Sequence, residues 1–281
     1  MSQAKPLTVG HSPDADDAFM YFGIERKAVG VPGHQVVHVM QDIETLNRRA
    51  MQGELDVTAI SVAVYPQVAD KYQILACGAS VGRSYGPLVL AKEPMAVADL
   101  RGKRLAIPGL NTTAYLVLRI YAEGFEPIVM DFDTIMAAVA AGQVDAGLII
   151  HEGQITYQGH FHKVLDLGEA WTQETGLPLP LGLDVAHRRL GDELIQRVFE
   201  MLRDSIGYAD AHEDEAVEYA LAFGRGIDAA TGKRFIRMYV NEDTRNMGAE
   251  GQRALEALFG RAAELRLIPS APPLDIVGLE L

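Results

Sequence analysis

The sequence predicts an α/β protein with two similar lobes and a ligand-binding cleft between them. Short apolar runs ending in glycine or a polar residue alternate with amphipathic segments, as in parallel sheets covered by helices. The helix–glycine–strand pattern Gly53–Val57 recurs as Gly142–Ala146. Further upstream, Leu7-Thr8-Val9 before a helix start recurs as Leu105-Ala106-Ile107. Two such units in tandem indicate two lobes, although the pattern is common enough in α/β proteins to recur by chance.

The amino-acid composition indicates a globular protein and excludes several classes of partner. The 281 residues are 48% hydrophobic and 22% charged, which is enough for one large or two modest globular domains. A net charge of −13 argues against a nucleic-acid partner. The single cysteine, Cys77, excludes an intramolecular disulfide and suits a reducing compartment. Met1–Gly10 has no apolar signal-peptide core, and no apolar run is long enough to cross a membrane. We therefore expect a cytoplasmic protein without a membrane partner.

In the first unit, Ser12 before Pro13 predicts the cap and first residue of a helix. Asp42 is expected to cap the next helix, and Gly53 to end it. The expected strands are Leu7–Gly10, Val36–Val39, Leu55–Ile60 and Ile74–Cys77.

In the second unit, Asn111-Thr112-Thr113 is expected to open a helix after the strand Leu105–Ile107. Asp133 is a candidate cap for a helix over Thr134–Ala141, which Gly142 would end. The strand Val144–Ile150 follows.

The last third of the chain is expected to return to the first lobe. Two prolines exclude a helix over Leu177–Leu183, which should cross between the lobes as an extended segment. From Asp192 onward, apolar residues at helical spacing predict helices. The predicted lobes are 1–91 with 184–281, and 92–183.

The run Gly147–Ile150 reads as a buried strand that ends in His151 and Glu152. Ligands of open α/β sheets bind at the carboxyl ends of strands, where an imidazole can accept a proton near neutral pH. His151 is therefore a candidate general base. The alternative is a histidine that only bonds to neighbouring backbone.

Thr112 and Thr113 at a helix start could hold a carboxylate or phosphate with free N–H groups and hydroxyls, or could be ordinary caps. Ser61 ends the matching strand and could contact the same ligand. Asp14, Asp16 and Asp17 suit the first turn of a helix, or form a cluster that polarises substrate or holds metal. Zinc, phosphate-loop and nucleophile-elbow motifs are missing, so we expect no metal and no cofactor.

Four segments together resemble the 1,4-dihydroxy-6-naphthoate synthase family of the futalosine route to menaquinone. They are His11–Phe19, Gly109–Tyr115, Ala146–Glu152 and Thr175–Gly182. The combination of Gly-Leu-Ile-Ile-His-Glu with Thr-Gly-Leu-Pro-Leu-Pro-Leu-Gly is specific. The resemblance covers nearly the whole chain, including Tyr239-Val240-Asn241.

This resemblance implies a fold like that of type II periplasmic binding proteins, with the site in the interlobe cleft. It implies a catalytic histidine at His151 and a small anionic substrate, cyclic dehypoxanthine futalosine, converted to 1,4-dihydroxy-6-naphthoate. The implied substrate-binding residues are Ser61, Thr112, Thr113, Ser12, Asp16 and Asn241. Whether the chain forms a homodimer is left open.

One segment departs from the family. Many members carry Ser-Pro-Cys-Pro-Asn-Asp-Thr-Phe, where this chain has Ser12-Pro13-Asp14-Ala15-Asp16-Asp17-Ala18-Phe19. The added carboxylates would repel a nearby anion, so a related substrate stays open. Two rival functions also remain: a cytoplasmic binding protein without catalysis, and a metal enzyme that uses these aspartates.

Overall fold

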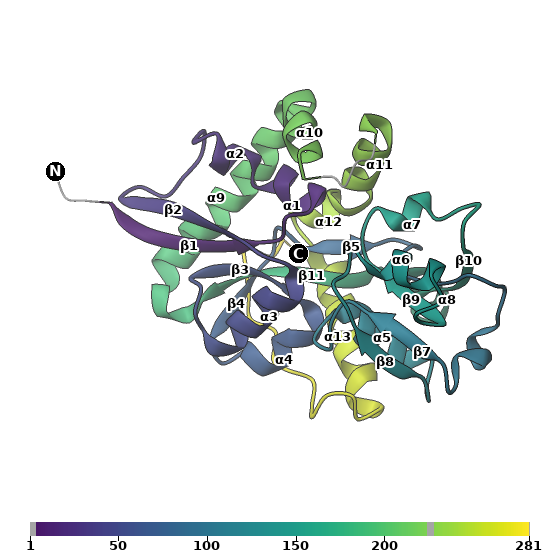
Figure 1. Cartoon of the computed structure of the whole chain (residues 1–281). Helices are drawn as coiled ribbons and strands as arrows, with labels where there is room; N and C mark the ends of the chain where they lie inside the picture. Colours follow the sequence, from purple (N-terminus) through teal and green to yellow (C-terminus); the bar gives the residue numbers. More distant parts are fainter. Residues whose placement is uncertain (1–3, 224–227, 281) are drawn as a thin grey trace.

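The computed structural model describes residues 4–223 and 228–280, which form two α/β lobes (Figure 1). The first sheet has the strand order β12-β4-β11-β3-β1-β2, with β5 beside β11. Its strands are β1 (Lys5–His11), β2 (His34–Met40), β3 (Val57–Ser61), β4 (Tyr72–Leu75), β5 (Ser80–Gly82), β11 (Leu179–His187) and β12 (Ile276–Val277). The second sheet has the order β10-β6-β9-β7-β8. Its strands are β6 (Leu88–Ala91), β7 (Arg104–Ile107), β8 (Glu126–Val129), β9 (Ala146–Ile149) and β10 (His162–Asp166).

The two sheets repeat one arrangement, as the sequence predicts. In each, a central strand pairs in parallel with two neighbours, and an antiparallel strand follows: β2-β1-β3-β11 and β8-β7-β9-β6. The repeated aspartate has the same role in both halves. Asp56 accepts the N–H of Thr8 at 2.9 Å, and Asp145 accepts the N–H of Arg104 at 2.8 Å. The two halves of the chain thus share a side-chain hydrogen bond to the central strand as well as the strand order.

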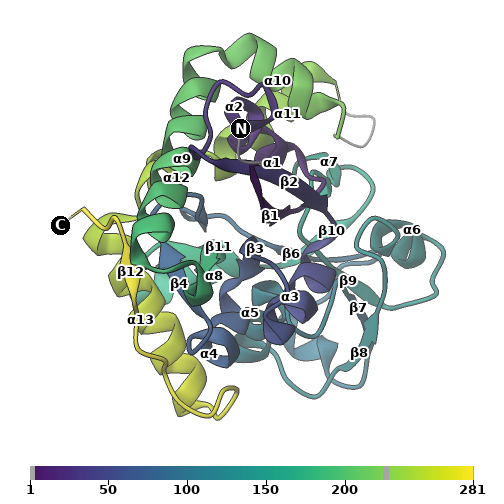
Figure 2. The same ribbon diagram turned by 90° about the vertical axis from the view of Figure 1, so that its left-hand side faces the viewer.

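Helices cover both faces of the first sheet (Figure 2). One face carries α1 (Ala15–Met20), α2 (Phe22–Glu25), α9 (Asp192–Ala211), α10 (Glu213–Leu221) and α11 (Ala229–Tyr239). The other carries α3 (Ile43–Gln52), α4 (Tyr65–Val68) and α13 (Gly248–Glu264). Around the second sheet lie α5 (Thr113–Tyr121), α6 (Ile135–Ala140), α7 (Gly153–Thr156) and α8 (Leu167–Thr175). The short α12 (Glu242–Arg245) and the 3₁₀ turns Val62–Val64, Val97–Leu100 and Arg188–Leu190 complete the elements.

Two of the predicted helix caps are confirmed and two are wrong. Asp42 accepts the N–H of Thr45, and Thr112 accepts that of Tyr115. Helix α1 begins only at Ala15, because the Ser12 hydroxyl donates to Asp14 instead of capping the helix. Helix α6 begins at Ile135 without a side-chain cap from Asp133.

The predicted lobe boundaries after residue 91 and before residue 184 differ from the sheet membership. Strand β6 pairs with β9 and β10, so the first crossing lies before Leu88. Strand β11 joins the first sheet from Leu179 onward, which confirms the extended crossing segment. Near the crossings, a Cβ atom on Gly168 would lie 1.9 Å from the carbonyl oxygen of Tyr85. Only glycine allows this close approach of the two chain segments.

Candidate active site

A cavity of about 120 Å³ lies where the two lobes meet. Its walls come from the β1–α1 loop, the ends of β3 and β9, the start of α5, the crossing strand β11, and α11. The lining residues are Ser12, Asp14, Asp16, Asp17, Ile43, Ala59, Ile60, Ser61, Gly78, Ser80, Pro87, Thr112, Thr113, Ala114, Ile150, Gln154, Leu181, Gly182, Leu183, Phe235 and Tyr239. The structure therefore brings five predicted substrate-binding residues, Ser12, Asp16, Ser61, Thr112 and Thr113, to one cavity.

The start of α5 offers backbone donors to this cavity. The Thr112 hydroxyl donates to the carbonyl of Gly109 and accepts from Tyr115. The Thr113 hydroxyl donates to the carbonyl of Leu181 at 2.6 Å and accepts from Ala63. Both hydroxyls thus position the helix. The N–H groups of Thr113 and Ala114 occupy the first turn, where a helix supplies no acceptor, so they can hold an anion.

Ser61 is held beside this helix start by Asn47, a residue that the sequence interpretation missed. Asn47 is fully buried in α3; its side-chain oxygen accepts the N–H of Ser61 at 2.8 Å. Its amide nitrogen donates to the Ser61 hydroxyl at 3.0 Å. Because the hydroxyl accepts this bond, its own hydrogen is available to the cavity. The one signal in the sequence is an amide next to Leu46 on the apolar side of a helix.

A hydrogen-bonded pair joins the lobes at the edge of the cavity. The carboxylate of Glu44 on α3 accepts the side-chain N–H of Asn111 at 2.7 Å and its backbone N–H at 3.1 Å. Burial raises the pKa of Glu44, against the effect of the bonds from Asn111. The pair closes the first lobe onto the loop that leads into α5.

We expect Glu44→Ala to loosen this closure. Hydrogen bonds to a charged group contribute about 1.5–3 kcal/mol, so the ratio of closed to open molecules should fall roughly tenfold or more. Small-angle scattering of the ligand-free protein should then show a larger radius of gyration. Glu54→Ala is the matched control, because Glu54 pairs with Arg49 of the same lobe. An equal change in both variants, or none in Glu44→Ala, would contradict a closing role.

His151 does not line the cavity in this structure, although Ile150 and Gln154 on either side of it do. Its residue is only 9% exposed, and the ring lies edge-on to Phe132 at 5.9 Å between centroids. The Nδ1 atom accepts the N–H of Gly153 at 3.0 Å and lies 3.8 Å from the Glu152 carboxylate. The bond from Gly153 leaves the hydrogen of a neutral ring on Nε2. The expectation that the imidazole projects into the cleft is therefore not met in this conformation, because the start of α7 binds the ring.

One wall of the cavity is acidic. Ser12 donates its N–H to Asp17 at 2.5 Å and its hydroxyl to Asp14 at 2.8 Å. Burial, and next the Asp17 charge, raise the pKa of Asp16 well above its usual value. Burial and the nearby Asp184 raise the pKa of Asp17 to about 8. Asp16 and Asp17 occupy the first helical turn as predicted, but burial makes these two far weaker acids than solvated caps.

The described residues contain no group of three or more His, Cys, Asp or Glu side chains arranged to hold a metal ion. The acidic wall nevertheless differs from a solvated helix start, because its carboxyl groups line the interlobe cavity and burial raises the pKa of Asp16 and Asp17. Neutral carboxyl groups there can donate hydrogen bonds to hydroxyl or carbonyl oxygens of a ligand.

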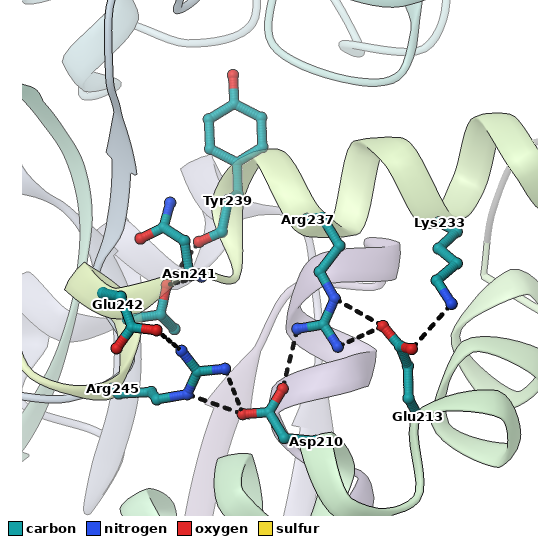
Figure 3. A network of polar contacts seen from close by, with 9 residues as sticks. Asp210, Glu213, Lys233, Arg237, Tyr239, Asn241, Glu242 and Arg245 are labelled. Atoms are coloured by element: carbon teal, nitrogen blue, oxygen red, sulfur yellow. Dashed lines mark hydrogen bonds and ion pairs between the residues drawn. The ribbon is translucent and has the colours of Figure 1, made fainter.

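Helix α11 closes the cavity with Phe235 and Tyr239, and Tyr239 donates to the side chain of Gln154 at 2.7 Å. Figure 3 shows Tyr239 pointing away from the ion pairs that fix this helix. Those pairs join Arg237 to Asp210 and to Glu213.

Asn241, predicted to bind substrate, does not line this cavity. Its side chain accepts the N–H of Asp243 at the start of α12 and donates to the carbonyl of Met238. Asn241 is thus used to turn the chain after α11. Tyr239, which lies two residues earlier, is the member of that segment that reaches the cavity.

Comparison with known proteins gives a consistent picture. Residues 7–264 match the model of a family described as menaquinone biosynthesis. The chain is 42% identical over 272 residues to a 1,4-dihydroxy-6-naphthoate synthase from Thermus thermophilus, covering 96% of this chain and 99% of that protein. It is 40% identical over 278 residues to a synthase of the same name from Streptomyces coelicolor, covering 96% and 97%.

Solved structures support the same fold. A protein from Archaeoglobus fulgidus is 46% identical, with a TM-score of 0.90 over 94% of this chain and 98% of that one. A Candida albicans protein described as having the generic periplasmic binding protein fold is 14% identical, with a TM-score of 0.69 over 98% of both chains. The latter likeness shows the fold alone, and it agrees with the two-lobed architecture. Within residues 4–223 and 228–280, no helix has the length and hydropathy needed to cross a bilayer.

Proposed function

The chain belongs to the menaquinone biosynthesis family, and from that premise we propose that it converts cyclic dehypoxanthine futalosine to 1,4-dihydroxy-6-naphthoate. It is an enzyme with a lyase-type reaction, as its full-length relatives indicate. The observation that carries the proposal is an interlobe cavity with opposite poles. Amide donors at the start of α5 face the space from one lobe, and the carboxyl groups of the β1–α1 segment face it from the other.

These two poles suit the two ends of the proposed substrate. The carboxylate that remains in the naphthoate product would bind the N–H groups of Thr113 and Ala114 and the Ser61 hydroxyl. The hydroxyl-bearing, sugar-derived portion would lie against Asp16 and Asp17. This orientation keeps the substrate's negative charge away from the acidic wall, so the added aspartates are compatible with an anionic substrate.

In the proposed reaction, His151 removes a proton from the bound substrate. The sugar-derived portion then leaves, and aromatisation of the remaining rings provides the driving force. For Nδ1 to accept the proton, the bond from Gly153 must open and the ring must turn toward the cavity. A positioned general base typically contributes ~10²–10⁴-fold to the rate.

Incubation of the purified protein with cyclic dehypoxanthine futalosine tests the proposal. Mass spectrometry should detect 1,4-dihydroxy-6-naphthoate and the released sugar-derived fragment in equal amounts. Saturable binding without product would instead support the rival function, a binding protein without catalysis. We also propose a cytoplasmic reaction, which the single buried thiol of Cys77 supports.

Ser61→Ala should raise the KM of this reaction about tenfold with little change in kcat. The removed hydroxyl would bind a carboxylate that is present in substrate and transition state alike, and such bonds contribute about 1.5–3 kcal/mol. Ser84→Ala is a suitable control, because Ser84 is not among the cavity residues. A large loss of kcat at unchanged KM would place Ser61 at the reacting atoms and contradict the assignment.

A further inference from the structure

Behind the acidic wall lies a further buried carboxyl group that has no role in the reaction proposed above. Asp184, on β11, is 1% exposed, and its Oδ1 accepts the hydroxyl of Tyr21 at 2.8 Å. Its Oδ2 has no hydrogen-bond partner within the described residues. That oxygen points at Gly78 of the cavity wall, where a Cβ atom would lie only 2.0 Å away.

A buried carboxylate oxygen without a partner is costly unless it shares or carries a proton. Asp17 is the neighbouring carboxyl group that faces the cavity, and its Oδ2 is already fixed by the N–H of Ser12. The charge of Asp184 is one of the causes that raise the pKa of Asp17. Buried carboxyl groups that interact in this way do not both ionise readily, so together they retain a proton that solvated aspartic acids would lose.

We propose that Asp17 is the general acid of the reaction, with Asp184 as the positioning residue that keeps the proton on it. The inference rests on the proposed function. When the base removes a substrate proton, the bond to the sugar-derived portion breaks and its electron pair moves to an oxygen of that portion. Asp17 transfers its proton to this oxygen. One proton leaves the substrate and one returns, so the step needs no oxidant or reductant.

The surrounding charges favour a protonated pair. Asp14 and Asp16 face Asp17 from the same segment, Asp184 from β11, and Glu152 faces Asp16 from the second lobe. Tyr21 and Cys77 are the other titratable groups near Asp184, and burial raises the pKa of both. Burial raises the pKa of Asp17 to about 8 and that of Asp184 to about 7. No cationic group is among the causes that shift Asp17 or Asp184.

Two isosteric variants test the assignment through the pH profile of kcat. The wild-type rate should fall above about pH 8, as Asp17 loses its proton. Asp17→Asn should lower kcat about a hundredfold and remove this alkaline limb. Asp184→Asn removes the neighbouring charge, so the limb should move down by about one pH unit, which a merely structural role would not produce.

Asp56→Asn is the control for both variants, because Asp56 is a partly buried aspartate of the same lobe, bound to Thr8 and Arg189. Its alkaline limb should match that of the wild type. Stabilisation of each variant by added 1,4-dihydroxy-6-naphthoate shows that it folds and binds. If Asp17→Asn does not fold, the position of the alkaline limb in the kcat profile of Asp184→Asn decides whether the acid assignment holds.

The outcomes separate this proposal from the one on which it rests. No turnover by the wild type overturns the proposed function. Turnover by the wild type, with Asp17→Asn within threefold of its kcat or with an unmoved limb in Asp184→Asn, overturns the acid assignment alone. Loss of the limb in the first variant and its downward shift in the second support it.

Discussion

His151→Asn should lower kcat by about 10²–10⁴ while leaving the affinity for the naphthoate product within a few-fold of wild type. Asparagine can still accept the N–H of Gly153, so the local backbone should keep its course. What the variant loses is a group that can take up a proton near neutral pH. Single-turnover measurements with saturating cyclic dehypoxanthine futalosine isolate the chemical step from product release.

His160→Asn is the matched control, since His160 is an exposed histidine that follows α7 in the same lobe. It should retain full turnover. Near-native turnover by His151→Asn would remove His151 as the base. A variant that loses product binding as strongly as turnover would instead place the imidazole in a binding role.

The position of this ring explains why the sequence located His151 but not its orientation. The strand β9 and its end follow from a short apolar run after Gly142, which is a local pattern. The orientation of the imidazole depends on the backbone two residues later, where Gly153 approaches closely. A Cβ on Gly153 would lie 2.8 Å from the His151 ring and 2.4 Å from the Met136 sulfur. No pattern in the sequence carries that information.

The tandem lobes could be predicted because their determinants are local. Gly53 and Gly142 both adopt positive φ after a helix, at 70° and 69°. Asp56 and Asp145 then bond back to the preceding central strand in each half. These positions recur at equivalent points, so a comparison of the two halves finds them.

The polar core of the site could not be predicted in this way, because its partners lie far apart in the chain. Tyr21 meets Asp184 across 163 positions, and Tyr239 meets Gln154 across 85. In the sequence, Asp17 fits an ordinary first helical turn, and Asp184 stands in an apolar strand without a local partner. Only the packing of β11 against the β1–α1 segment reveals that these acids share one buried environment.

This burial predicts that Asp17→Asn and Asp184→Asn each stabilise the protein at pH 8 by at least about 2 kcal/mol. The folded protein holds these protons up to about pH 8 for Asp17 and about pH 7 for Asp184. The unfolded chain releases them near pH 4. Between those values the unfolded state binds fewer protons, so the free energy of unfolding falls as the pH rises. The asparagine side chain of either variant does not titrate, so it removes this pH-dependent loss.

The gain from each variant should therefore be absent near pH 4 and complete near pH 8, where the thermal midpoint should rise by about 5 °C.

Asp56→Asn supplies a control of opposite sign. Burial acts to raise the pKa of Asp56, but hydrogen bonds from Thr8 and Arg189 outweigh it and lower that pKa. Asp56→Asn should thus cost stability at neutral pH, and the loss should shrink as the pH falls below 4. Calorimetric scans from pH 4 to 8 measure all three variants. If Asp17→Asn and Asp184→Asn were no more stable than wild type at pH 8, the two aspartates would be ordinary ionised groups. The cavity would then present a negative wall to its substrate.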